Sequence, residues 1–494
     1  MPSSTSSNSS NGELPPDVEK QEAPITPGGE GPSERKKDEE RIIDSPAEAA
    51  EDWQIPPEPD ILNPDADGMA GAVNRVLSRI STKSSWNPGP PPDGGKVAWL
   101  ACLCGHFAIM NTWGFINSFG VFQAYYVSQL GRPPSDISWI GSIQVFLTFF
   151  IGTFTGRFTD AGFFRLVTIC GIVFMTLGIF TTSVATQYWQ LILSQGLCMG
   201  IGSGCIFCPT ISTVSTYFSK KRSLAIGITA SGSVTGGLIF PAMARQLLPS
   251  VGFGWAVRAI GFVQLATMIF SVSFMKSRLP PRRAGSLVEW AAFREPEYTL
   301  YAIGMFFNFW GVYFGFYYLA AFARSAQMIT PALSYTDSLN LLLILNGVGL
   351  LGRILPNHLA DRFGPLNLMI PACLGCGTAV LAWMAVKTPA QLYGWSVAYG
   401  IVAGAIQSLF PAGLSSLTTD LRKQGTRMGM TFTIVSFAVL TGNPIAGAII
   451  SSMGGRYAGA QGFTGASLLV GTVLLSGARF VRMRRTGRGW KTKI

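Results

Sequence analysis

The chain has 494 residues, of which 48% are hydrophobic and 13% charged, with a formal net charge of +11. Soluble domains average about 25% charged residues, so this composition argues against a soluble domain and predicts an all-α protein that crosses a membrane many times. The charge is split, because residues 1–92 hold 8 Lys and Arg against 17 Asp and Glu, whereas the rest holds 29 against 9. The basic excess gathers in loops on one side of the predicted spans and therefore does not indicate nucleic-acid binding.

Residues 1–92 are rich in Ser, Pro, Gly and Glu and nearly free of aromatic residues. Such a segment cannot bury enough apolar surface to fold alone, so we expect a disordered cytoplasmic tail. It begins with polar residues rather than a basic stretch and an apolar core, which predicts that no signal peptide is cleaved. The run Gly-Pro-Pro-Pro-Asp-Gly-Gly at residues 89–95 separates the tail from the first span.

Twelve apolar segments then follow, each long enough to cross a hydrocarbon layer of about 30 Å as a helix. They are predicted at residues 96–125, 137–158, 166–186, 190–217, 224–248, 253–275, 298–323, 339–359, 366–386, 392–417, 428–450 and 463–480. The longest loop of the body, residues 276–297, divides them into a first six-helix bundle at 93–275 and a second at 298–481. Residues 482–494 form a basic tail that we expect to meet anionic lipid.

The loops predict the orientation of the chain. Lys and Arg are concentrated in the even-numbered loops, the central linker and the C-terminal end. Because cytoplasmic loops of membrane proteins carry an excess of Lys and Arg, both termini are predicted to be cytoplasmic. We expect a multi-pass protein of the plasma membrane.

The two bundles repeat each other at a nearly constant offset. Asn111-x-Trp113-Gly114 recurs as Asn308-x-Trp310-Gly311. Asp160 matches Asp361 at an offset of 201, and Pro209, Gly227 and Pro241 match Pro411, Gly429 and Pro444 at 202 or 203. Parallel repeats of six helices are typical of transporters whose binding site lies near the midplane between the halves.

A single full charge, Arg353, lies well inside a predicted span. Charge inside lipid costs several kcal/mol, so this side chain must face protein or a watery cavity, and we interpret it as lining a substrate path. A structural arginine that holds neighbouring helices is an equal alternative. The nine acidic residues of the body all lie at span ends or in loops, which disfavours a pump for cations and favours an anionic substrate that could pair with Arg353.

Helical spacing places further candidates beside Arg353. Asn346 shares its helix face, and His106, Trp113 and Asn117 share one face of the first span, so we expect both faces to border the cavity. His106 could relay a proton, but a neutral histidine satisfied by a neighbour is the favoured interpretation. Trp113 and its counterpart Trp310 could stack on a substrate, although packing is favoured.

Other chemistry is disfavoured. Two Cys-x-x-Cys pairs fall inside spans, where packing is the favoured role, and with two histidines in the chain no metal site and no cofactor are expected. No phosphate-binding loop or nucleophile–base pair appears, so an enzyme is not predicted. A membrane nutrient sensor of transporter ancestry, signalling through its N-terminal tail, remains an alternative.

Two motifs carry a family resemblance. Asp93-Gly94-Gly95-x-x-Ala98-Trp99 before the first span, together with Tyr217-Phe218-Ser219-Lys220-Lys221-Arg222-Ser223-Leu224-Ala225-x-Gly227, resembles the monocarboxylate porter family of the major facilitator superfamily. The run at residues 111–122 is similar to fungal members. Gly156-x-x-x-Asp160 and Ala360-Asp361-Arg362-x-Gly364 look like the cytoplasmic loop motif of the superfamily, which makes Asp160, Asp361 and Arg362 candidate gate residues.

The resemblance implies secondary transport of organic anions by alternating access, with Arg353 at the position of the arginine in the eighth helix of the animal lactate carriers. Those carriers have an aspartate where this chain has Gly349 and a cavity lysine where it has Asn117, so lactate–proton symport is not carried over. We therefore predict a transporter for a small organic anion or carboxylated metabolite, with a proton as a candidate coupling ion. Export of a fungal secondary metabolite is favoured over uptake of a monocarboxylate or vitamin.

Overall fold

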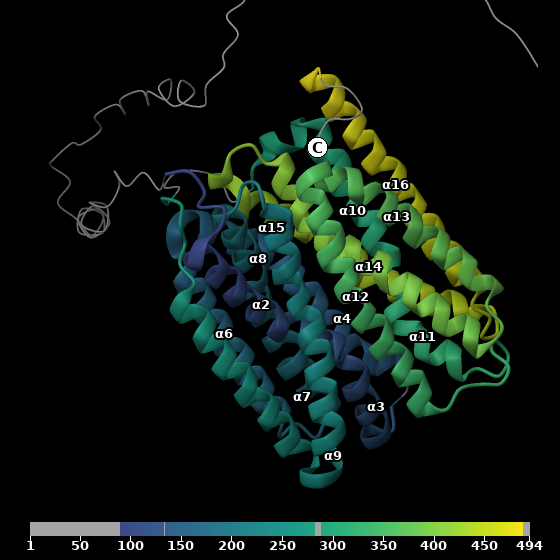
Figure 1. Cartoon of the computed structure of the whole chain (residues 1–494). Coiled ribbons are helices and arrows are strands. Elements are labelled where there is room, and N and C mark those ends of the chain that lie inside the picture. The colour runs from purple at the N-terminus through teal and green to yellow at the C-terminus, as the bar shows by residue number, and fades with distance from the viewer. Residues whose placement is uncertain (1–88, 133, 282–287, 488–494) are drawn as a thin grey trace, which may run out of the picture. The chain divides into compact units, whose positions relative to one another are not determined.

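A computed structural model describes residues 89–132, 134–281 and 288–487, and the regular structure of these residues is entirely helical (Figure 1). The long helices and their short continuations are α2 (Gly95–Asn117), α3 (Phe119–Leu130), α4 (Pro134–Phe150), α5 (Gly152–Phe158), η3 (Thr159–Phe163), α6 (Phe164–Thr182), α7 (Tyr188–Leu191), η4 (Ile192–Cys198), α8 (Met199–Tyr217), α9 (Arg222–Phe274), η5 (Trp290–Arg294), α10 (Pro296–Val312), α11 (Phe314–Arg324), α12 (Tyr335–Phe363), α13 (Pro365–Ala382), η6 (Trp383–Ala385), α14 (Pro389–Leu417), η7 (Leu421–Lys423), α15 (Gln424–Ser452) and α16 (Ala458–Thr486).

Nine helical stretches of the described residues are long and apolar enough to cross a membrane. Two of the nine are hairpins, since the backbone turns at Gly162 (φ 92°) between α5 and α6 and at Gly252 (φ 75°) within α9. One further span is α10 followed by α11, which are separated only at Tyr313. Counting each arm once gives twelve membrane-spanning helices, as the sequence predicts.

Apolar side chains face outward where a membrane would surround the protein. On α6, Leu166, Val173 and Leu177 are each more than half exposed. In water these residues would form an exposed apolar stripe, whereas in a bilayer they contact lipid tails. The structure therefore describes a multi-pass membrane protein.

Glycines bring the helices of the first half into close contact. A Cβ atom on Gly232 would lie 2.1 Å from the His106 carbonyl oxygen, and one on Gly236 would lie 2.3 Å from that of Met110. The backbones of α9 and α2 therefore touch, in the way that small residues allow between membrane helices. This contact fixes the face that α2 presents to the second half.

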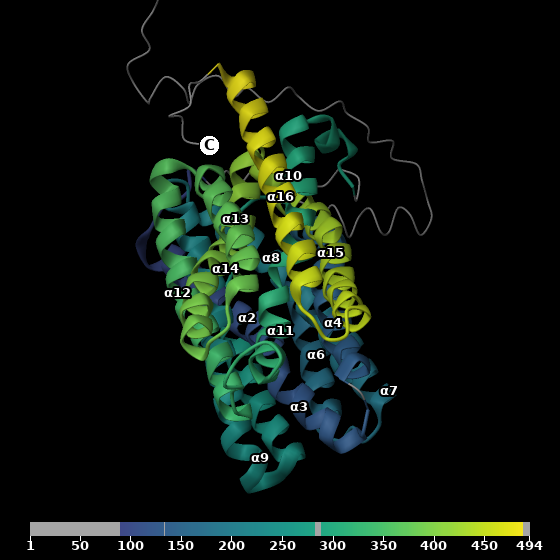
Figure 2. The same cartoon turned by 90° about the vertical axis from the view of Figure 1, so that its right-hand side faces the viewer.

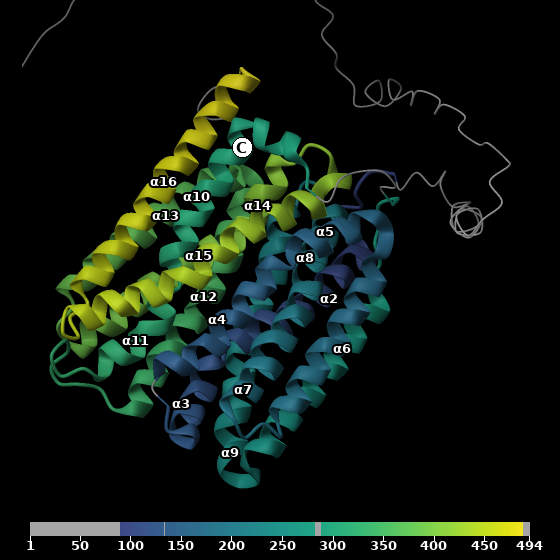
Figure 3. The same cartoon turned by 180° about the vertical axis from the view of Figure 1, so that it is seen from behind.

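The two halves, α2 to α9 and α10 to α16, meet where α9 packs against α12 and α14 and where α4, α5 and α8 pack against α15. Figure 3 shows α15 beside the helices of the first half, and Figure 2 shows α16 running along α10 and α13. We call the end of the bundle where α2 begins and α16 ends the termini end. Most of the predicted tail at 1–92, together with parts of the predicted linker at 276–297 and tail at 482–494, lies outside the described residues.

Candidate functional site

A central pocket lies between the two halves. Six aromatic rings contributed by both halves form most of its wall: Trp113, Phe149, Phe207, Phe309, Tyr313 and Phe410. Its polar side chains include Arg353 from α12, Gln407 from α14 and Ser233 from α9. The pocket thus has an aromatic wall with one positive charge.

The guanidinium of Arg353 is buried, with 1% of the residue exposed. Its Nη1 donates to the Gly349 carbonyl oxygen at 3.1 Å, and its Nη2 donates to Gln407 Oε1 at 2.5 Å. Both acceptors are neutral, and the ion pairs of the described residues do not include Arg353. A buried charge that is held only by neutral groups is costly, which makes Arg353 a candidate functional residue.

Two glycines make room for this guanidinium. A Cβ atom on Gly349 would lie 2.6 Å from Arg353 Nη1, and one on Gly404 would lie 3.2 Å from it. A Cβ on Gly352 would lie 2.0 Å from the Ile401 carbonyl oxygen, so α12 and α14 are in backbone contact at this level. Gly349 therefore supplies both the space and the carbonyl acceptor for Arg353.

Trp113 lies in the wall of the pocket and packs against rings from both halves. Its ring is parallel to that of Tyr313, with an interplanar angle of 3° and centroids 6.2 Å apart. It also contacts Phe149 and Phe207, with centroids 5.0 and 5.4 Å away. Its Nε1 is buried and has no hydrogen-bond partner among the described residues.

Asn117 and Asn346 lie beside the pocket rather than in its lining. Asn117 Nδ2 donates to the carbonyl oxygen of the lining residue Ser233 at 3.4 Å. A Cβ atom on Gly237 would contact both amides, at 3.4 Å from Asn117 Cβ and 4.0 Å from Asn346 Oδ1. The two predicted asparagines therefore come together from α2 and α12.

His106 and Trp310 are directed elsewhere, and neither lines the central pocket. The ring of His106 is held against α9, with Nδ1 2.9 Å from the Ile228 carbonyl oxygen and Nε2 3.1 Å from Thr235 Oγ1. Trp310 Nε1 donates to Thr441 Oγ1 at 3.0 Å. The contacts of both residues agree with the packing role that the sequence favours.

The termini end is closed by two carboxylates, each at the N-terminus of a helix in the opposite half. Asp160 accepts hydrogen bonds from Gly425 N, Thr426 N and Thr426 Oγ1 at 3.0, 2.7 and 2.7 Å, an arrangement we call the α15 cap. Asp361 accepts from Ser223 N and Leu224 N at 2.8 and 2.9 Å, which we call the α9 cap. Carboxylates suit these places because a helix N-terminus carries partial positive charge and unpaired N–H groups.

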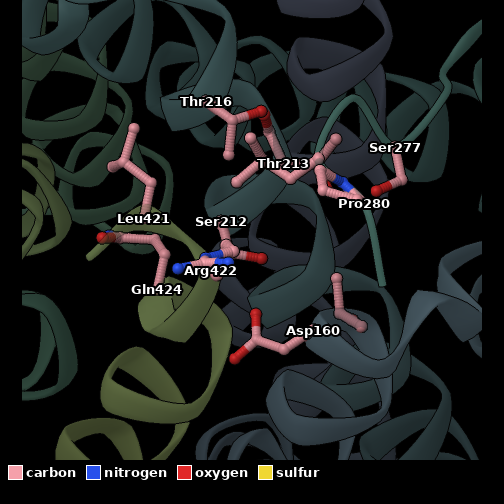
Figure 4. Close-up of a pocket in the computed structure, with 11 residues that line it drawn as sticks. Asp160, Ser212, Thr213, Thr216, Ser277, Pro280, Leu421, Arg422 and Gln424 are labelled. Atoms are coloured by element: carbon pink, nitrogen blue, oxygen red, sulfur yellow. The ribbon is translucent and has the colours of Figure 1, made fainter. Parts of the chain in front are cut away.

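A second pocket lies at the termini end beside the α15 cap (Figure 4). Asp160, Ser212 and Arg422 are among its lining residues. Arg362, the third predicted gate residue, is exposed and lies over the Phe363 ring with its guanidinium carbon 5.5 Å from the ring centroid. The interaction across the halves comes from its neighbour Asp361.

Gln407 and Tyr313 belong to the pocket but are not singled out in the sequence analysis. Gln407 carries a polar amide in the middle of the 392–417 span, and this position is the signal by which the sequence could have identified it as a pocket residue. Tyr313 is one of many aromatic residues in its segment, so nothing in the sequence distinguishes it.

Comparisons with known proteins agree with this architecture. The family model of the Major Facilitator Superfamily matches residues 101–421. An MFS-type transporter of Gibberella zeae is 62% identical over 82% of this chain and 90% of its own length. An aspyridones efflux protein of Emericella nidulans is 35% identical over 81% of this chain and 82% of its own.

Among solved structures, the fucose:proton symporter of E. coli superposes with a TM-score of 0.59 at 15% identity, covering 78% of this chain and 98% of that one. At this identity the likeness concerns the fold alone. The relatives are transporters and not enzymes. The chain belongs to the Major Facilitator Superfamily of membrane transporters.

Proposed function

We propose that this protein is a secondary active transporter that moves a small organic anion or carboxylated metabolite by alternating access. The observation that carries the proposal is the buried guanidinium of Arg353, which lines the central pocket and whose acceptors among the described residues are Gly349 and Gln407. A carboxylate would neutralise this charge and accept two parallel hydrogen bonds from it. The resemblance to monocarboxylate porters supports the same substrate class.

The bundles at 93–275 and 298–481 are the moving units of this proposal. Transport requires that the pocket open first to one side of the membrane and then to the other. Opening at the termini end must break the α15 and α9 caps, so Asp160 and Asp361 act as gate residues, with Arg362 beside the second. Because the distribution of Lys and Arg favours cytoplasmic termini, the described state is closed toward the cytoplasm.

Export across the plasma membrane is the favoured direction. The 35% identical relative named for efflux of aspyridones supports export over uptake of a vitamin or monocarboxylate. A proton is the candidate coupling ion.

Flux measurements on the full chain in proteoliposomes test the proposal. We expect labelled carboxylates, supplied as a panel of aromatic and aliphatic acids, to cross with wild-type protein. Arg353→Gln should lose at least about 100-fold in rate, because the anion then lacks its charged partner in a low-dielectric site. Arg353→Lys should retain part of the flux, since it keeps the charge but not the forked donor.

Arg456→Gln is the matched control, because Arg456 is exposed in the loop between α15 and α16. Equal flux in Arg353→Gln and wild type would contradict an anion site at Arg353. If no carboxylate crossed with any variant, the sensor alternative would gain weight over transport.

A further inference from the structure

Besides Arg353, two residues that line the central pocket carry a hydrogen-bond donor that lacks an acceptor. Trp113 Nε1 and Gln407 Nε2 are both buried without a partner among the described residues. Trp113 and Gln407 both line the pocket, and Trp113 is 7% exposed. An unsatisfied buried donor costs about 1–3 kcal/mol, and a ligand with acceptors placed there would recover that cost.

The orientation of the Gln407 amide follows from its neighbour. A guanidinium has only donors, so Gln407 must present its oxygen to Arg353, as the 2.5 Å contact to Oε1 shows. Its Nε2 is then left as a donor. The hydroxyl of the lining residue Ser233 already donates within α9 to the Ala230 carbonyl oxygen at 2.7 Å. The pocket therefore offers more unused donors than one carboxylate on Arg353 would require.

The aromatic wall adds a requirement of shape. The parallel rings of Trp113 and Tyr313 come from opposite halves and give the pocket two planes of the same orientation. Flat conjugated ligands stack on such planes, whereas saturated rings of equal size make fewer contacts. Because one plane belongs to each half, a flat ligand would contact both halves at once.

We infer that the pocket selects flat, conjugated organic anions that carry a second hydrogen-bond acceptor, with the charged oxygen on Arg353, the second acceptor on Trp113 Nε1 or Gln407 Nε2, and the ring system against Trp113 and Tyr313. This inference rests on the proposed function and narrows its substrate class. Simple aliphatic monocarboxylates are poor ligands in this scheme.

Four probes of similar size separate the requirements, with binding measured by calorimetry on the full chain in nanodiscs. Coumarin-3-carboxylate is flat and anionic and has a carbonyl beside its carboxylate. 2-Naphthoate lacks the second acceptor, decahydro-2-naphthoate is also saturated, and coumarin-3-carboxamide lacks the charge. We expect affinity to fall about tenfold from the first probe to 2-naphthoate, about tenfold again to the saturated acid, and at least tenfold from the first probe to the carboxamide.

Variants assign the second acceptor. Trp113→Phe keeps a ring but removes Nε1, and Gln407→Leu removes the amide. At least one of them should reduce the preference for coumarin-3-carboxylate over 2-naphthoate to about twofold or less. Trp255→Phe is the control, because Trp255 is 60% exposed on the outer surface and should leave the preference unchanged.

The outcomes distinguish this inference from the proposed function. If the three carboxylates bind equally well and the carboxamide does not, the anion site stands and the selection for flat, acceptor-rich anions is wrong. If the preference exists but survives both Trp113→Phe and Gln407→Leu, the assignment of the second acceptor is wrong. If the carboxamide binds as well as the carboxylate, or if no probe binds, both proposals fail.

Discussion

Two of the contacts between the halves, α5 with α15 and α12 with α9, are copies of each other, and they differ at one informative position. At the first contact, a Cβ atom on Gly429 of α15 would lie 2.1 Å from the Gly152 carbonyl oxygen. At the second, a Cβ on Gly227 of α9 would lie 2.6 Å from the Arg353 carbonyl oxygen. Gly152 and Arg353 therefore occupy equivalent places, 201 residues apart. One copy has kept only close backbone packing at this place, whereas the other has gained the charge that lines the pocket.

The α15 and α9 caps differ from each other less than Gly152 differs from Arg353. Both use an aspartate on the N-terminus of a helix in the opposite half, and the α15 cap includes a side-chain donor, Thr426 Oγ1. The caps are thus common to both copies, whereas the buried charge of the pocket belongs to the second. The next four predictions test this division.

Gly429→Ala should have the largest effect. Its new Cβ would overlap the Gly152 carbonyl oxygen, so α15 and α5 must separate, because backbone atoms cannot move aside as the end of a flexible side chain can. We expect loss of several degrees in thermal unfolding temperature and loss of flux. Gly394→Ala is the control, since a Cβ there meets nothing within 4 Å and alanine favours the helix. An unchanged unfolding temperature in Gly429→Ala would show that the contact is not close.

Replacing either cap aspartate with asparagine should open the termini end, and the effect should be larger at the α15 cap. Cys208 is a reporter, because its thiol is buried with Sγ 3.9 Å from the Gly425 carbonyl oxygen beneath the α15 cap. In Asp160→Asn we expect alkylation of Cys208 to accelerate about tenfold, since hydrogen bonds to a charged group are lost. Asp361→Asn should give a smaller increase. Peptide mass spectrometry measures both rates, and a larger effect at Asp361 would reverse the proposed ranking.

A linker carboxylate supports the start of α15 through ion pairs. Glu289 pairs with Lys423 at 2.7 Å and with Arg427 at 3.3 Å, whereas the first-half position equivalent to Arg427 is Ala225. Burial tends to raise the pKa of Glu289, but the hydrogen bonds and charges of Lys423 and Arg427 outweigh it and hold the pKa below its ordinary value.

Glu289→Gln should therefore cost about 1–3 kcal/mol of stability at neutral pH. A carboxylate whose pKa is lowered by folding stabilises the protein above its unfolded pKa, and that contribution disappears as the pH falls through the lowered value. The difference in unfolding temperature between wild type and Glu289→Gln should thus shrink below about pH 4. Asp420→Asn, at an exposed ion pair, is the control. A difference that stayed constant with pH would argue against the ion cluster.

The sequence predicts the fold well because the length of each span and the 201-residue offset between the halves both depend only on the order of residues along the chain. The offset also pairs Asp160 with Asp361. That these two residues are equivalent follows from their positions along the chain, without knowledge of the direction in which either side chain points. The face that a helix turns toward the pocket is less predictable. In lipid, apolar and aromatic residues suit every face, so Trp113 and Trp310 look alike in sequence but have different surroundings. Gln407 was missed for the same reason, because an amide in a span can face a pocket or a neighbouring carbonyl.

The two tryptophans give the smallest expected effect and the sharpest contrast between the copies. Trp310→Phe removes the hydrogen bond from Nε1 to Thr441 Oγ1, which should cost about 1 kcal/mol of stability, but leaves the pocket intact. We expect the affinity for coumarin-3-carboxylate to stay within about twofold of wild type, measured by the same calorimetry that tests Trp113→Phe. A tenfold loss of affinity in Trp310→Phe would mean that the second-half tryptophan reaches the substrate in another state of the cycle, and the division of roles between the copies would then be wrong.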